Sequence, residues 1–205
     1  MQKSNILTNR HIGILILIES FLMVFAMLHH PQGVSNDPYQ IGLAKWVHGS
    51  LIFMLIFNAF GMVRLSNTFR AKGRDTALGI LFYQVGLGGF LVATMVSGFV
   101  QTSLIEFYYT DLELFSSLSK FAAIFNQAFA KLGVISFGAA GVLLFPVLIP
   151  EKGMSRLVAI TGGIVGSILI ISMLSGVNLS VMNMTLLTVL IVVWHCSIGL
   201  WFLKN

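Results

Sequence analysis

Residues 157–177 read LVAITGGIVGSILIISMLSGV, a stretch that contains no charged side chain. A helix needs about 20 mostly apolar residues to cross the roughly 30 Å hydrocarbon core of a bilayer, so this stretch predicts a transmembrane helix. Five other stretches have the same character. The absence of strict alternation between apolar and polar residues favours helices over the strands of a barrel. The six predicted spans cover about residues 11–28, 42–63, 77–100, 122–148, 157–177 and 185–203.

The composition of the whole chain supports the same class. Hydrophobic residues make up 57% of the 205 residues and charged residues only 9%, against about 25% charged residues in an ordinary soluble domain. This excludes a water-soluble protein and a disordered one. The lone Cys196 excludes a disulfide framework, and scattered basic residues with a net charge of +5 argue against nucleic-acid binding. We therefore predict an all-α polytopic membrane protein, a bundle of six transmembrane helices in the lipid bilayer, with residues 1–205 forming one transmembrane domain.

The distribution of basic residues predicts the orientation. Alternating the six spans places nine of the 12 Lys and Arg residues on one side of the membrane. Because positive charge accumulates on the cytoplasmic side, we expect both termini to be cytoplasmic and the protein to lie in the inner (plasma) membrane. No small-residue cleavage motif follows the first apolar stretch, so we expect that span to be retained. The nine residues are Lys3, Arg10, Arg64, Arg70, Lys72, Arg74, Lys152, Arg156 and Lys204; Lys45, Lys120 and Lys131 fall on the other side.

Two local patterns add structural expectations. Glu106 and Glu113 are seven residues apart and so share one helical face, with Leu104, Tyr108, Leu112 and Phe115 roughly opposite. This pattern predicts an amphipathic interfacial helix over about 103–118, or otherwise a surface loop. Gly162 and Gly166 have the GxxxG spacing of closely packed membrane helices. We expect this pair to pack within the chain; an oligomer contact or a substrate groove is the alternative.

Polar side chains inside predicted spans indicate a structural or functional role, because placing an ionisable group in a bilayer costs free energy. Glu19 lies about 12 Å from the inner face and His195 about 15 Å from the outer face, at about 1.5 Å of rise per residue. The two side chains can therefore meet near the middle of the membrane, with Asn58 and Gln84 somewhat nearer the inner face. This group predicts a proton or ligand pathway; a hydrogen-bonded cluster that only fixes helix register is the alternative.

A second polar group is predicted at the outer face. His29 and His30 end the first span, and His48 lies at a similar depth in the second. Neutral imidazole binds Zn, Cu, Ni and Fe, and the outer carboxylates Glu106 and Asp111 are candidate additional ligands. These residues predict a site for copper, zinc or haem; a proton pathway or simple interfacial anchoring is the alternative. Gln127 and Lys131 are predicted to form an outer polar cluster on the same side.

Three short motifs carry a resemblance. The runs Met27-Leu-His-His-Pro31, Val47-His48-Gly49 and Ser97-Gly-Phe-Val100 resemble small, uncharacterised bacterial polytopic membrane proteins with an HHP…HG…GF pattern. The resemblance covers about the first half of the chain and implies no activity. It draws attention to the outer histidines.

The sequence leaves three functions open. The first is a membrane protein with an outward-facing histidine site for a transition metal or haem, acting in redox chemistry or metal handling. The second is a non-catalytic subunit of a larger membrane complex, or a homo-oligomer. The third is a small proton-coupled transporter that uses Glu19 and His195. Whether the protein catalyses a reaction is not decided by the sequence.

Overall fold

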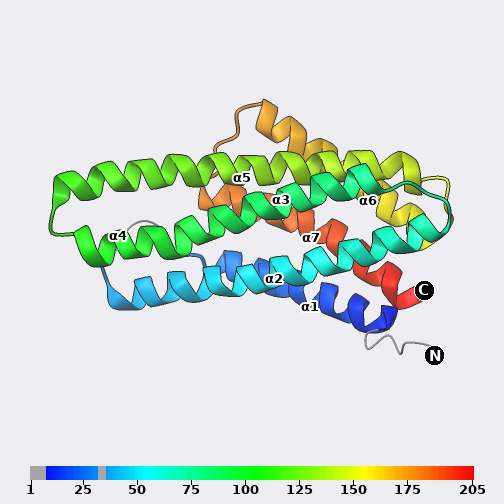
Figure 1. Ribbon diagram of the computed structural model, residues 1–205, viewed down its shortest axis with the longest axis horizontal. Helices are drawn as coiled ribbons and strands as arrows, with labels where there is room; N and C mark the ends of the chain where they lie inside the picture. The colour runs from blue at the N-terminus through cyan, green and yellow to red at the C-terminus, as the bar shows by residue number, and fades with distance from the viewer. Residues whose placement is uncertain (1–7, 32–35) are drawn as a thin grey trace.

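The computed structural model describes residues 8–31 and 36–205, and these residues form helices and the turns between them, with no strand. In chain order the elements are α1 (Asn9–Leu28), α2 (Pro38–Ala71), α3 (Ala77–Met95), the π-helical turn η1 (Val96–Val100), α4 (Gln101–Tyr108), α5 (Leu112–Leu148), α6 (Met154–Leu174) and α7 (Val181–Lys204). Within the described residues, six helices are long and apolar enough to cross a membrane, with α3, η1 and α4 forming one of them. The predicted number of spans is therefore confirmed (Figure 1).

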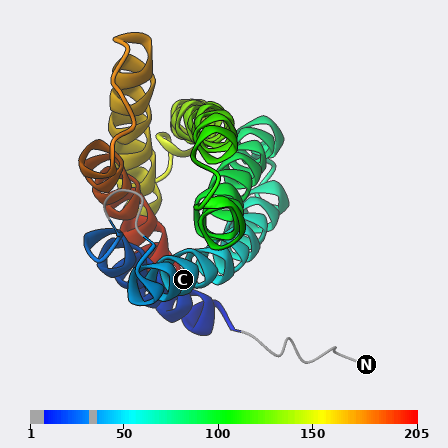
Figure 2. The same ribbon diagram turned by 90° about the vertical axis from the view of Figure 1, so that its left-hand side faces the viewer.

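The six spans form a ring. Each span packs against the next in the order α1, α2, α3, α5, α6, α7, and α7 closes the ring on α1 (Figure 2). The start of α1 and the end of α7 lie at the same end of the bundle (Figure 1). We call the opposite end of the bundle the far face. The sequence analysis predicts that the far face is the outer one.

The spans differ in length in a way that shapes the far face. At about 1.5 Å per residue, α2 with 34 residues and α5 with 37 are roughly 50 Å or more long, whereas α1 with 20 is about 30 Å. A bilayer core is about 30 Å thick, so α2, α4 and α5 extend beyond the ends of α1 and α7 at the far face (Figure 1). The longer helices therefore form walls around the end of the shorter ones.

The predicted interfacial helix over residues 103–118 is not present as a separate element. Its first part belongs to α4, which continues α3 without a break, and its second part begins α5. A turn at residues 109–111 separates them, and Asp111 caps α5 by accepting from the backbone N–H of Leu114 at 3.1 Å. The amphipathic pattern therefore belongs to the ends of two helices, α4 and α5, that pack against each other, and not to one separate helix.

Close packing between α5 and α6 depends on glycine. A Cβ atom on Gly141 would lie 2.3 Å from the carbonyl oxygen of Gly162, and one on Gly166 would lie 2.4 Å from that of Gly138. The predicted GxxxG pair thus packs within the chain. On the outside of the ring, large apolar side chains such as Phe21, Phe53 and Leu174 are exposed, as expected of a surface that faces lipid.

We predict that Gly141→Ala lowers stability. The added methyl group must push α6 away, and overpacking of this kind costs about 1–3 kcal/mol. The matched control is Gly88→Ala, because nothing lies within 4 Å of a Cβ at Gly88. Unfolding in mixed detergent micelles measures both variants. Equal stability of Gly141→Ala and Gly88→Ala would contradict the packing described.

Candidate functional site

Four buried polar side chains meet inside the ring. Glu19 from α1, Asn58 from α2, Tyr83 from α3 and His195 from α7 are each no more than 3% exposed. We call them the central cluster. Three of the four, Glu19, Asn58 and His195, belong to the predicted pathway group, and the structure brings them together.

Asn58 links the members of the central cluster. Its amide nitrogen donates to Glu19 Oε1 and lies 2.9 Å from His195 Nδ1, and its carbonyl oxygen accepts from the Tyr83 hydroxyl. Tyr83 Oη lies 2.7 Å from His195 Nε2, and Glu19 Oε1 lies 3.7 Å from His195 Nδ1. Glu19 Oε2 is buried without a hydrogen-bond partner. The arrangement is a closed set of hydrogen bonds with one carboxylate oxygen left open.

The fourth predicted member, Gln84, does not join this cluster. Its side-chain nitrogen lies 3.5 Å from the carbonyl oxygen of Ala59, and the side chain is only partly buried. Tyr83, the preceding residue, occupies the inner face of α3 in its place. Adjacent residues on a helix point about 100° apart, so the sequence identified the right depth on α3 and the wrong face.

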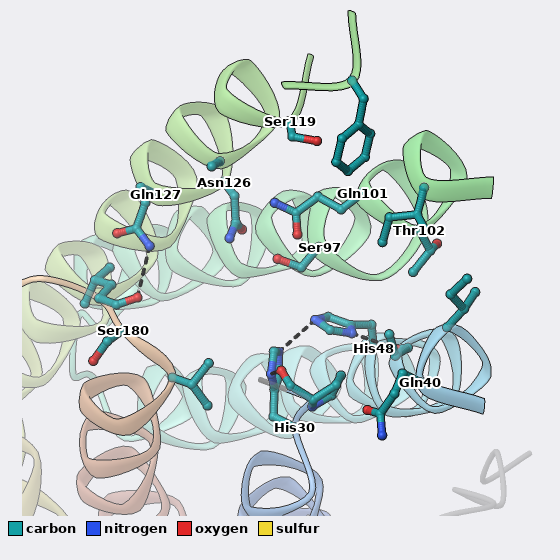
Figure 3. Close-up of a pocket in the computed structure, with 18 residues that line it drawn as sticks. His30, Gln40, His48, Ser97, Gln101, Thr102, Ser119, Asn126, Gln127 and Ser180 are labelled. Atoms are coloured by element: carbon teal, nitrogen blue, oxygen red, sulfur yellow. Dashed lines mark hydrogen bonds between the residues drawn. The ribbon is translucent and has the colours of Figure 1, made fainter. Parts of the chain in front are cut away.

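A larger polar cavity opens near the far face. Its volume is about 720 Å³, and residues from α2, η1, α4 and α5 and from the ends of α1 and α7 line it (Figure 3). We call it the far cavity. Its polar lining consists of His30, Gln40, His48, Ser97, Gln101, Thr102, Ser119, Asn126, Gln127 and Ser180.

His30 and His48 point toward each other in the far cavity (Figure 3). Their Nε2 atoms are 3.1 Å apart. His30 Nδ1 lies 2.9 Å from the carbonyl oxygen of Pro31, and His48 Nδ1 lies 2.7 Å from that of Ala44. A carbonyl oxygen can only accept, so each Nδ1 carries the hydrogen. In the neutral rings both Nε2 atoms are therefore acceptors, and their lone pairs oppose each other across 3.1 Å.

Two acceptor nitrogens at this distance are stabilised by a cation that both can bind, either a proton or a metal ion. Burial in the cavity wall lowers the pKa of His30, and the hydrogen bond to Pro31 opposes that shift only in part. Burial thus disfavours the protonated ring. The opposed neutral imidazoles are the form in which histidine binds metals.

The π-helical turn η1 brings backbone close to His48. A Cβ atom on Gly98 would lie 2.2 Å from His48 Cβ, closer than any real contact. The wider π turn leaves carbonyl groups that the hydroxyl of Thr102 bonds, at 2.8 Å to Gly98 and 3.1 Å to Phe99. Such π turns occur frequently at functional sites. Of the motifs quoted in the sequence analysis, one residue from each thus meets here: His30, His48 and Gly98.

The other predicted metal ligands lie elsewhere. His29 is exposed and bonds the carbonyl oxygen of Phe25 at 2.9 Å. Glu106 forms an ion pair with Lys45 at 2.7 Å, and Asp111 caps α5. In residues 8–31 and 36–205, no three His, Cys, Asp or Glu side chains gather in an arrangement that could hold a metal ion. A metal at the far face would therefore have two protein ligands from this set.

The predicted outer polar cluster is divided. Gln127 lines the far cavity and donates to the carbonyl oxygen of Leu179 at 2.9 Å, which ties α5 to the segment before α7. Lys131, one turn along α5, is exposed. Gln127 thus helps to close the cavity wall, and Lys131 does not line the cavity.

Comparison with protein-family models, with curated proteins and with solved structures found no match to this chain.

We predict that Asn58→Leu destabilises the protein by about 1–3 kcal/mol, because it removes the donor to a buried carboxyl group and leaves Tyr83 and His195 without their shared partner. Gln84→Leu is the matched control, since this amide lies on the neighbouring face and outside the central cluster. Unfolding in mixed micelles measures both. A smaller effect for Asn58→Leu than for Gln84→Leu would contradict the role given to Asn58.

Proposed function

We propose that this multi-pass membrane protein binds a transition metal ion in the far cavity, with His30 and His48 as its two imidazole ligands. The observation that carries the proposal is the pair of opposed Nε2 lone pairs, each fixed by an Nδ1–H donated to a backbone carbonyl. A hydrogen bond from the second ring nitrogen is the usual way in which a metal-binding histidine is oriented.

The separation of the two nitrogens fits this chemistry. Metal–nitrogen bonds of about 2.0–2.1 Å bring two nitrogens 3.1 Å apart when the angle at the metal is about 100°, which suits neighbouring positions in a tetrahedral or octahedral shell. A haem held between the two rings is a poorer fit. Axial ligands on opposite faces of the iron need nitrogens roughly 4 Å apart, twice the length of one such bond.

Two protein ligands leave the other coordination positions open to the far cavity. The neutral oxygen donors on its wall, including Gln101, Ser97 and Asn126, suit water molecules or a small chelating molecule around the ion. A site of this kind holds an ion that can exchange, which favours metal handling at the membrane surface over a permanent structural metal. If the far face is outside the cell, as the basic residues predict, the ion comes from the exterior.

We predict that purified protein in detergent binds Zn²⁺ and that His30→Ala and His48→Ala each weaken binding by more than about tenfold, because each removes one of two imidazole ligands. His29→Ala is the matched control, since this neighbouring histidine is exposed and does not line the far cavity. Isothermal titration calorimetry gives the affinities, and the nitrogen couplings of bound Cu²⁺ in electron paramagnetic resonance count the imidazoles. Wild-type protein that binds neither ion, or a His29 variant that loses binding equally, contradicts the proposal.

We also predict that Gly98→Ala weakens metal binding, because the new methyl group overlaps the His48 side chain and must move its ring. Gly49→Ala serves as the control. A Cβ at Gly49, next to His48 in sequence, meets only Phe99 at an ordinary 3.9 Å. The same titration measures both variants. Unchanged affinity in Gly98→Ala, with the variant folded, would show that close packing on His48 does not set the ligand geometry.

A further inference from the structure

A small cavity lies between the far cavity and the central cluster. Its volume is about 80 Å³, and its lining includes His195 of the central cluster. We call it the passage. Its polar lining, besides His195, consists of the hydroxyls of Thr94 and Thr188, and the remainder is apolar and rich in methionine.

The positions of the lining residues along α1 and α7 place the far cavity, the passage and the central cluster at successive depths in the bundle. On α1 the far cavity has His30, the passage has Met27 and Met23, and the central cluster has Glu19, in steps of three to four residues. On α7 the same order runs from Val181 through Met184 and Thr188 to His195. Steps of three to four residues follow one face of a helix, one turn at a time. The far cavity, the passage and the central cluster therefore lie one below another inside the ring.

The passage is mostly apolar, and its volume is large enough for water. One water molecule needs about 10–15 Å³ of cavity accessible to a probe of its size and two to four polar partners. The passage has the volume for several, and the hydroxyls of Thr94 and Thr188 are its polar partners, because both ring nitrogens of His195 bond Asn58 and Tyr83. A proton that moves between the far cavity and the central cluster on the inside of the ring has to pass through this region.

The central cluster can satisfy its hydrogen bonds in two ways that differ by one proton. With Glu19 ionised, the Asn58 amide donates to Glu19 and to His195 Nδ1, His195 Nε2–H donates to Tyr83, and Tyr83 donates to the Asn58 oxygen. With Glu19 protonated, the Asn58 amide is turned over. Its oxygen accepts from Glu19 and from His195 Nδ1–H, its nitrogen donates to Tyr83, and Tyr83 donates to His195 Nε2. Every bond reverses, and none is lost.

We propose that the central cluster is a proton-binding site, with Glu19 as the group that takes up the proton and the passage as its route from the far cavity. This goes beyond the metal site, because it assigns a second ligand, the proton, to a different set of residues. A proton from water in the passage binds the Glu19 carboxylate, whose charge changes from −1 to 0. Asn58, Tyr83 and His195 reverse their hydrogen bonds around it and remain neutral.

The groups around Glu19 make it the natural proton acceptor. The titratable side chains that face it are Tyr83 from α3 and His195 and Cys196 from α7, and Cys196 contacts Ser20 of α1. The neighbouring α2 contributes the neutral Asn58, and among residues 8–31 and 36–205 no Lys or Arg forms an ion pair with Glu19. Glu19 Oε2 is buried and without a hydrogen-bond partner, so a charge on the carboxylate is stabilised through Oε1 alone.

Infrared spectroscopy tests the proposal directly. A protonated carboxyl group in an apolar site has a C=O stretching band separate from the amide bands, and we expect this band to grow in wild-type protein as the pH falls. Glu19→Gln removes it. Glu106→Gln, which changes an exposed glutamate paired with Lys45, retains it. Wild-type protein with no such band at any pH, or a band that persists in Glu19→Gln, overturns the proposal.

Two further variants keep the test decisive if Glu19→Gln does not fold. Tyr83→Phe removes the hydroxyl that both bonding patterns use, so the midpoint pH of the band shifts.

Thr188→Val removes a hydroxyl of the passage without changing side-chain size, so the band responds more slowly to a pH jump. Thr185→Val, three residues away and outside the passage, responds at the wild-type rate. An unshifted midpoint in Tyr83→Phe, or sodium replacing pH as the trigger of the change, contradicts a proton site.

The proton site and the metal site can be separated experimentally. His30→Ala and His48→Ala lie at the far face and leave the four residues of the central cluster unchanged, so the infrared band persists in both variants. Loss of the band in either variant, with the protein folded, would make protonation of Glu19 depend on the far histidines and overturn a separate proton site.

Discussion

A carboxyl group in the middle of a membrane-spanning bundle is the most costly side chain in this protein, and the arrangement of its helices depends on accommodating it. Glu19 faces the inside of the ring, away from lipid, where α1, α2, α3 and α7 each contribute one polar residue. Lipid cannot supply hydrogen bonds, so partners must come from other helices or from trapped water. The central cluster therefore fixes the rotation of four helices at once, and small residues between α5 and α6 complete the ring.

The far face follows from helix length. Because α1 and α7 end where α2, α4 and α5 continue, the bundle is hollow there, and polar residues can line a cavity without contacting lipid. His30 lies just beyond the end of α1 and His48 lies within α2, so their meeting depends on this difference in length. The glycine at position 98 and the π turn around it allow the approach of η1 to His48. The passage lies between this hollow and the central cluster.

Much of this could be predicted from the sequence, because hydropathy and helical rise are local properties. They identified six spans, the shared depth of Glu19 and His195, and the nearness of His48 to the end of α1. Hydropathy and helical rise do not reveal which face of each helix points inward. The sequence therefore predicts Gln84 as a member of the buried polar group, whereas Tyr83 is the residue of α3 that belongs to the central cluster. The sequence also does not reveal whether His29 or His30 faces His48, because this depends on the backbone conformation at the end of α1. The two glutamates of residues 103–118 suggested a surface helix because the pattern does not reveal that two helix ends share it.

Both proposed sites depend on a polar cavity inside the ring of helices, at the face opposite the chain ends. Thiol accessibility tests it most directly, in a Cys196→Ser background that leaves no other cysteine. We predict that a membrane-impermeant maleimide labels Ser97→Cys, in the far cavity, in intact spheroplasts, and labels Asn205→Cys only after the membrane is opened. Labelling of Asn205→Cys in intact spheroplasts, or protection of Ser97→Cys until the membrane is opened, would contradict the account.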